Sequence, residues 1–363
     1  MTTATRMPLA HEGDDVSSPP PFEPPHWLRG PHAQTIIARY WPYPRARIAS
    51  SYVEVEVEDG DRISILESCP PLWAAGDPAA ILIHGLGGTA RSPYVVRVAK
   101  KLFDRGVRVV RMNLRGAGAG FGAARRFYHS GKTEDLRSVV SWLAEHSPDS
   151  PIGLVGFSLG ANLVLKLAGE AADDPLPGLD CLVAANPPLD LDACCRFINR
   201  PGNRVYDRAF LRLLCAEVSR LHDAFPELGP IDLSSASSLL DFDDHYTAPR
   251  NGFADASDYY ARSSAGPLVP RITLPGLVIH AEDDPFIPAD PFLQLAFPPH
   301  LALELIPHGG HLGYLSRNRW KGDRRWLDAR ILAWLAERWP LGRSTAHRDD
   351  SGQIHSTPEV GRS

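Results

Sequence analysis

Short apolar runs recur along the chain and alternate with segments in which apolar residues repeat every three or four positions. The runs span residues 80–84, 107–113, 152–157, 180–186, 276–281 and 301–306. Continuous runs of this kind are typical of strands buried on both faces of a parallel sheet. Residues 133–146 and 323–339 carry apolar stripes with helical spacing. Strands that alternate with helices predict a doubly wound α/β fold with a mostly parallel sheet.

Two segments near the start of the chain follow another pattern. Residues 52–59 alternate strictly between apolar and polar side chains, which predicts an antiparallel strand. Residues 62–68 predict its partner, because the turn-forming residues Asp59, Gly60 and Asp61 separate the two segments. We therefore expect a β-hairpin ahead of the parallel strands.

The longest interval between predicted strands runs from residue 186 to residue 274. It contains a helical pattern over residues 205–221 and several aromatic side chains. The interval is too long for a simple crossover, and it predicts a mainly helical cap insertion at about residues 187–270. We expect this cap to lie over the carboxyl ends of the strands, where open α/β sheets bind their ligands.

The two ends of the chain lack the apolar content of a core. Residues 1–24 are rich in proline, serine and charge, which predicts a disordered leader. Residues 342–363 are polar and predict a disordered tail. One domain with its cap is therefore expected over residues 25–341.

Composition excludes several classes of protein. The formal net charge of the 363 residues is −5 and no basic stripe stands out, so we expect no nucleic-acid partner. No run reaches the about 18 apolar residues of a membrane span, and the N-terminal residues lack the apolar core of a secretory signal. Peripheral contact with a membrane stays open. Five cysteines without a CxxC pair predict free thiols in a reducing cytoplasm.

Ser158 stands between Gly156 and Gly160 where a predicted strand passes into a predicted helix. This G-x-S-x-G pattern in that context predicts a nucleophile elbow, a forced turn that presents the serine hydroxyl at the head of a helix. The backbone N–H groups and the helix dipole there favour developing negative charge. The alternative interpretation is a structural turn in which Ser158 is a helix N-cap.

A serine nucleophile needs a base, and on such a sheet the acid and the histidine follow the serine in that order. Asp283 and Asp284 come directly after the apolar run 276–281, and we favour Asp284 as the acid. His308 and His311 follow the next run, and we favour His311 as the base because two glycines before it let the loop turn inward.

Two backbone N–H groups are expected to bind the oxyanion of the reaction. One belongs to Leu159, directly after the serine, and the other to Leu86 in the glycine-rich loop of residues 84–90. That loop and residues 115–120 match neither the phosphate-loop nor the dinucleotide-binding pattern. Residues 241–249 hold three aspartates and a histidine without a known metal-binding spacing. We therefore expect no cofactor and no metal.

The chain resembles the YheT-like branch of the α/β-hydrolases, which includes fungal medium-chain ethanol acyltransferases and mammalian membrane-associated lipases. The resemblance extends over residues 24–340. Its motifs are 27-WLRGPHAQTI-36, 84-HGLGG-88, 112-MNLRGAG-118, 156-GFSLGAN-162, 242-FDDHYTAPRNGFADASDYYARSSA-265, 283-DDPF-286 and 309-GGHLGY-314. It implies the α/β-hydrolase fold and an ester hydrolase or acyltransferase, with the family's catalytic residues on Ser158, Asp284 and His311. Residues 27–35 are interpreted as a structural arm that packs on the domain.

Three functions are weighed on these residues. The favoured one is a serine esterase that cleaves a small-molecule ester, with short to medium acyl chains, through an acyl-enzyme. An alcohol O-acyltransferase would use the same three residues and replace water by an alcohol in the second step. A catalytically silent binding protein would keep the fold, but nothing in it would require all three residues together.

Overall fold

The computed structural model describes residues 18–42, 48–339 and 341, and it confirms the expected mostly parallel α/β sheet. Within these residues eight strands form one sheet in the order β1-β2-β4-β3-β5-β6-β7-β8. The pairs β1–β2 and β2–β4 are antiparallel, and every other pair is parallel. The strands are β1 Ser51–Glu56, β2 Arg62–Ser68, β3 Ala79–Ile83, β4 Arg108–Met112, β5 Ile152–Phe157, β6 Leu179–Ala185, β7 Gly276–Ala281 and β8 Leu301–Ile306.

The burial of each strand follows from its place in the sheet. All residues of β3, β4, β5 and β7 are buried, as their continuous apolar sequences predict. In the edge strand β1, Val55 is buried while Glu54 and Glu56 are exposed, which matches the alternation of that segment.

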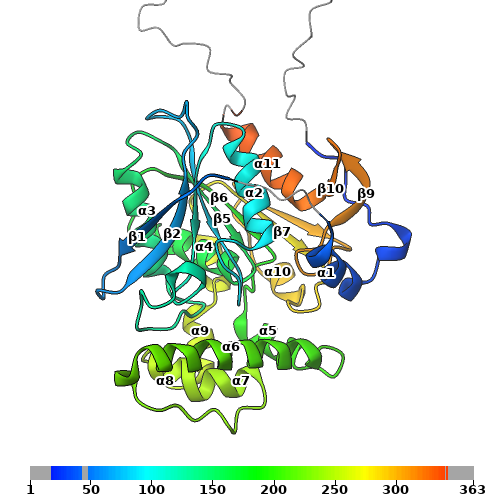
Figure 1. Cartoon of the computed structure of the whole chain (residues 1–363). Coiled ribbons are helices and arrows are strands. Elements are labelled where there is room, and N and C mark those ends of the chain that lie inside the picture. The colour runs from blue at the N-terminus through cyan, green and yellow to red at the C-terminus, as the bar shows by residue number, and fades with distance from the viewer. Residues whose placement is uncertain (1–17, 43–47, 340, 342–363) are drawn as a thin grey trace, which may run out of the picture.

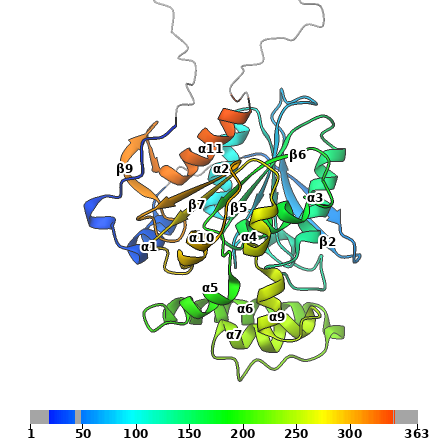
Figure 2. The ribbon, with the colours of Figure 1, turned by 180° about the vertical axis from the view of Figure 1, so that it is seen from behind.

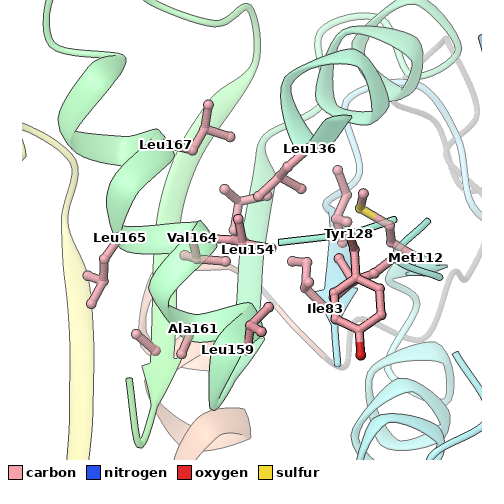
Figure 3. Packing of buried hydrophobic residues seen from close by; sticks show 14 of the residues in the cluster. Ile83, Met112, Tyr128, Leu136, Leu154, Leu159, Ala161, Val164, Leu165 and Leu167 are labelled. Carbon is pink, nitrogen blue, oxygen red and sulfur yellow. The ribbon is translucent and has the colours of Figure 1, made fainter. Parts of the chain in front are cut away.

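Helices cover both faces of the sheet (Figure 1). The helices of the described residues are α1 Pro31–Tyr40, α2 Pro93–Phe103, α3 Thr133–Glu145, α4 Leu159–Glu170, α5 Leu191–Ile198, α6 Arg204–Ala224, α7 Leu239–Phe242, α8 Ala248–Arg250, α9 Ala256–Ser263, α10 Asp290–Gln294 and α11 Trp326–Arg338. Helices α2 and α11 pack in one apolar cluster and α3 and α4 in another. Figure 3 shows the second cluster, in which Val164 and Leu159 of α4 lie near Leu154 of β5 and Leu136 of α3. The end of α4 that carries the serine is thereby packed on the core.

Helices α5 to α9 connect β6 to β7 and form a separate layer beyond the carboxyl ends of the strands (Figures 1 and 2). The sequence pattern places a helix at residues 205–221, and α6 is slightly longer at Arg204–Ala224. Apolar side chains of α6, including Leu211, Leu214 and Val218, join the core cluster of the α3–α4 face. The layer therefore packs on the sheet domain rather than projecting from it.

The structure differs from the sequence predictions at two places. The predicted helix at 323–339 begins only at Trp326, because residues 323–325 form strand β10 against β9 (Leu315–Trp320).

Residues 18–24, which composition places in the leader, contact the domain. Phe22 packs against Tyr314 and Trp326. The Trp326 indole N–H also donates to the Pro20 carbonyl, and the Arg317 N–H to that of Glu23. The average composition of the segment does not reveal such individual contacts. The rest of the predicted leader, residues 1–17, and the whole predicted tail, residues 342–363, lie outside the described residues.

Candidate active site

The turn between β5 and α4 holds Ser158 in an unusual backbone conformation. Its φ is 54° and its ψ is −122°, a region that residues with a Cβ seldom occupy. A Cβ on Gly156 would lie 2.4 Å from the Gly160 carbonyl oxygen, and one on Gly160 would lie 2.5 Å from that of Ile83. The glycines are therefore required sterically, as the elbow interpretation predicts. The Ser158 side chain makes no N-cap hydrogen bond, which is evidence against the purely structural alternative.

Replacing Ser158 by glycine should give a more stable protein than replacing it by alanine. Strain of about 1–3 kcal/mol at such a backbone position persists with alanine and is relieved by glycine. Glycine costs about 0.5–1 kcal/mol through the entropy of the unfolded chain. We expect a free energy of unfolding about 1 kcal/mol higher for Ser158→Gly than for Ser158→Ala, measured by urea denaturation.

The matched control is Ser219, an exposed residue in the middle of α6. At an ordinary helical position alanine is the more stable of the two by about 1 kcal/mol. The free energy of unfolding should therefore be higher for Ser219→Ala than for Ser219→Gly, the opposite of the order expected at Ser158. If the alanine variant were the more stable one at both positions, Ser158 would store no backbone strain.

Three side chains from distant parts of the sequence form a hydrogen-bonded row. His311 Nε2 lies 3.0 Å from Ser158 Oγ, and His311 Nδ1 lies 2.8 Å from Asp284 Oδ2. A carboxylate only accepts hydrogen bonds, so the imidazole donates from Nδ1 and accepts the serine hydroxyl proton at Nε2. The structure thus brings together the serine, the acid and the base that the sequence favours.

Asp284 is fully enclosed and well supplied with donors. Its Oδ1 accepts from the Phe286 and Ile287 N–H groups, and its Oδ2 accepts from the Asn186 amide at 2.7 Å as well as from His311. Burial by itself would raise the pKa of this carboxyl. The neighbouring His311 and the Phe286 N–H outweigh burial, and the pKa lies below its usual value. Asp284 is therefore ionised at neutral pH and holds the imidazole by its Nδ1–H.

The two rejected candidates lie beside this row but outside it. Asp283 accepts from the Gly310 N–H at 2.8 Å, and burial raises the pKa of its carboxyl. His308 is 46% exposed and its Nδ1 lies 3.5 Å from Asp283. Neither side chain has a hydrogen bond to Ser158 or His311 among the described residues. Asp283 instead supports the backbone of the loop that carries His311.

The N–H groups of Leu86 and Leu159 are available for an oxyanion. Around Leu86, the Gly85 and Gly87 N–H groups donate to the hydroxyls of Tyr94 and Tyr128. The Leu86 N–H donates to no atom of the described residues. Leu159 is the first residue of α4, so its N–H has no acceptor within the helix. A Cβ on Gly85 would lie 2.9 Å from Ser158 Cβ, so this glycine lets the two N–H groups approach the serine.

Helix α1 supports the loop that carries His311. The sequence predicts that residues 27–35 pack on the domain, but it does not predict this role. The His311 N–H donates to Thr35 Oγ1 at 2.8 Å. The fully buried Gln34 amide bonds both the N–H and the carbonyl of Leu315. Leu312 and Tyr314 have positive φ. These contacts hold a strained loop in place. The sequence signal for them is weak: Gln34 and Thr35 are two polar residues in α1, a helix that is otherwise partly apolar.

A pocket opens at Ser158 and extends under the cap. About 860 Å³ of space lies within it when the open solvent at its mouth is included. Phe210 and Leu214 of the cap helix α6 line it. Leu211 and Leu221 are buried in the packing of the cap instead. The lining is mainly apolar and aromatic, which suits an apolar part of an ester.

The described residues contain no group of three or more His, Cys, Asp or Glu side chains that could hold a metal ion. In residues 241–249, Asp244 and His245 are exposed, and Asp243 lines the pocket. Among all the helices that the structure describes, none has the length and apolar character needed to cross a membrane.

Comparison with known proteins gives a consistent result. The model of the alpha/beta hydrolase family matches residues 80–320. The chain is 34% identical over 328 residues to the Escherichia coli (strain K12) protein YheT, which is named as an esterase, covering 89% of this chain and 95% of YheT. It is 29% identical to a monoacylglycerol lipase of Saccharomyces cerevisiae, covering 71% of this chain and 59% of that protein. The Pyrococcus furiosus esterase Pf2001 shares the fold, with a TM-score of 0.54, 16% identity and coverage of 91% of this chain and 99% of that chain.

Proposed function

This chain belongs to the YheT-like branch of the alpha/beta hydrolase family and is a carboxylic ester hydrolase, and we propose that it acts by serine catalysis. Ser158 is the nucleophile, His311 the general base and Asp284 the residue that orients it. The N–H groups of Leu86 and Leu159 form the oxyanion hole. The observation that carries the proposal is the row of hydrogen bonds from Asp284 through His311 to Ser158.

In the first half of the reaction, His311 Nε2 takes the proton from Ser158 Oγ as the oxygen attacks the ester carbonyl carbon. The carbonyl oxygen becomes an oxyanion, which accepts hydrogen bonds from Leu86 and Leu159. The ionised Asp284 stabilises the imidazolium through Nδ1–H. His311 then gives its proton to the departing alcohol, and an acyl-Ser158 ester remains.

In the second half, a water molecule takes the place of the alcohol. His311 Nε2 removes a proton from the water as its oxygen attacks the acyl carbon. The same two N–H groups bind the second oxyanion. The bond to Ser158 Oγ breaks, the serine recovers its proton from His311, and the carboxylic acid leaves.

A fluorophosphonate probe tests this proposal directly, since it reacts only with an activated serine. We expect one covalent adduct per chain, and peptide mass spectrometry should locate it on Ser158. An adduct on another serine, or no adduct together with no ester hydrolysis, would refute the assignment.

The acyl group is proposed to be of medium length. The cap places Phe210 and Leu214 along the pocket, and each buried CH₂ contributes roughly 0.8 kcal/mol at most. We predict that kcat/KM for p-nitrophenyl esters rises several-fold per two carbons from C2, reaches its maximum between about C4 and C10, and then falls. A scan from C2 to C12 measures this. A flat profile would show that the apolar pocket residues only pack the cap.

A second candidate is acyl transfer to an alcohol. The chain is 28% identical to a yeast protein named medium-chain fatty acid ethyl ester synthase/esterase, covering 67% of this chain. Ethanol would replace water in the second half of the reaction. Product analysis at low ethanol separates the two functions: we expect a minor share of ethyl ester, and synthesis in excess of hydrolysis would identify an acyltransferase.

A further inference from the structure

Residues 84–88, which we call the oxyanion loop, are fixed at the peptide group that carries the Leu86 N–H. The Gly85 carbonyl accepts hydrogen bonds from the Gly88 N–H at 3.0 Å and from Nδ1 of the buried His84 at 2.8 Å. Because the Leu114 N–H donates to His84 Nε2, the ring proton is on Nδ1. The Gly85 carbonyl and the Leu86 N–H belong to one planar trans peptide group, so a fixed carbonyl directs the N–H to the opposite side.

The next peptide group of the loop is held by Tyr128. The Gly87 N–H donates to the Tyr128 hydroxyl at 3.2 Å. The Tyr128 ring is buried beside Ile83 and Met112, and its hydroxyl points away from them (Figure 3). The glycines on either side of Leu86 leave the backbone conformationally permissive. The direction of the Leu86 N–H therefore depends on such contacts from outside the loop.

The Tyr128 hydroxyl is bonded in turn to the cap. It donates to Glu217 Oε2 of α6 at 3.1 Å, and burial raises the pKa of Tyr128 well above its usual value, so the hydroxyl keeps its proton. Leu213, four residues before Glu217, lies on the same side of the helix. A Cβ on Gly87 would lie 2.0 Å from Leu213 Cδ2, so this side chain fills the space beside the glycine. One side of α6 thus contacts the oxyanion loop by an apolar contact and by a hydrogen-bonded chain through Tyr128.

We propose that Tyr128 and Glu217 are positioning residues for the oxyanion hole, through which the cap helix α6 keeps the Leu86 N–H directed at the substrate carbonyl. They act on the reaction through Gly87 and not by contact with the reacting atoms. The oxyanion hole is then complete only while α6 packs on the oxyanion loop, so the cap takes part in catalysis besides enclosing the pocket. The inference rests on the proposed function, because it concerns the oxyanion hole of the same site.

A pair of ketone inhibitors tests this role. With 1,1,1-trifluoro-2-decanone, Ser158 Oγ adds to the carbonyl carbon, the serine proton passes to His311, and the carbonyl oxygen becomes an oxyanion at the Leu86 and Leu159 N–H groups. The less electrophilic 2-decanone has the same chain length and binds as the ketone. The ratio of the inhibition constant of 2-decanone to that of the trifluoromethyl ketone therefore measures how well the site stabilises an oxyanion.

Tyr128→Phe keeps the ring and removes the hydroxyl that accepts from Gly87. We expect the inhibitor ratio to fall about 10-fold or more. The kcat for p-nitrophenyl octanoate should fall about 10- to 50-fold with KM changed less than about 3-fold, because misplacing an oxyanion donor costs less than the about 10²- to 10³-fold of removing one.

Two variants of Glu217 test the other end of the chain, and they decide the question alone if Tyr128→Phe does not fold. Glu217→Met removes the acceptor and should lower the inhibitor ratio about 5-fold. Glu217→Gln keeps an oxygen for the Tyr128 hydroxyl and should stay within about 2-fold of the wild type. The double variant with Tyr128→Phe and Glu217→Met should be no worse than Tyr128→Phe alone, since both residues act through one chain of hydrogen bonds.

Tyr246→Phe is the matched control. Its buried hydroxyl lies 3.1 Å from Nε2 of His222, so the bond joins two elements within the cap. The substitution also removes a buried tyrosine hydroxyl, and it leaves the contacts of the oxyanion loop unchanged. The inhibitor ratio should stay at the wild-type value even if the melting temperature falls.

The outcomes are distinct. Equal changes in both inhibition constants for Tyr128→Phe and Glu217→Met, or no change in either, would show that these side chains only pack the cap, and the proposed function would stand. Effects that multiply in the double variant, or a Glu217→Gln variant as impaired as Glu217→Met, would also overturn the inference. Absence of ester hydrolysis and of a fluorophosphonate adduct in the wild type would remove the proposed function and this inference together.

Discussion

Ser158→Ala is expected to lower kcat for ester hydrolysis by about 10⁴-fold or more and to abolish fluorophosphonate labelling. The substitution removes the oxygen that lies 3.0 Å from His311 Nε2, and no other group at the turn can form the acyl-enzyme. It changes one side-chain atom and keeps the backbone of the turn. The melting temperature should therefore stay within a few degrees, as measured by circular dichroism.

Ser263→Ala is the matched control. The Ser263 hydroxyl is buried and has no hydrogen-bond partner among the described residues, so its removal tests the loss of a buried serine oxygen away from His311. This variant should label and hydrolyse like the wild type. Undiminished labelling of Ser158→Ala would mean that a different serine is the nucleophile.

The second large effect is expected at the histidine and its acid. His311→Ala should lower kcat by about 10³-fold or more, because no base remains to take the serine proton. Asp284→Asn should also cost about 10³-fold or more. The asparagine oxygen is needed by the Phe286 and Ile287 N–H groups, so its NH₂ would face His311. The imidazole would then carry its proton on Nε2, where the serine proton has to be received.

The adjacent residues of the same types are the controls for this prediction. His308→Ala alters an exposed side chain, and Asp283→Asn keeps an oxygen for the Gly310 N–H. Each should reduce kcat by less than about 10-fold. If His308→Ala were the more damaging histidine variant, or Asp283→Asn the more damaging acid variant, the assignment within that pair would be reversed. Circular dichroism of all four variants separates misfolding from loss of catalysis.

Much of the candidate site could be predicted because its members follow local patterns. Ser158 lies between glycines at the end of a buried strand, and each of its partners directly follows a later strand. In a parallel sheet those strand ends meet at one edge, so the order along the chain indicates proximity in space. The choice of His311 over His308 also had a local basis, since Gly309 and Gly310 both adopt positive φ.

Strand β10 and the neighbouring β9 could not be predicted in the same way. Residues 315–325 are mostly charged and polar, with no alternation of apolar side chains. Their pairing depends on contacts outside the segment: Gln34 of α1 bonds both backbone groups of Leu315. A pattern read along one segment contains no information about a partner 281 residues away.

The sequence by itself determined the sheet, the elbow and the order of serine, acid and base, because hydrophobic periodicity and glycine spacing are properties of neighbouring residues. Only the tertiary structure decided what holds and surrounds them. The Thr35 hydroxyl accepts a hydrogen bond from the His311 N–H, and the Asn186 amide donates one to Asp284. Both contacts join residues that are remote along the chain. Such contacts arise when separate elements pack together, and no periodicity within any one element encodes them.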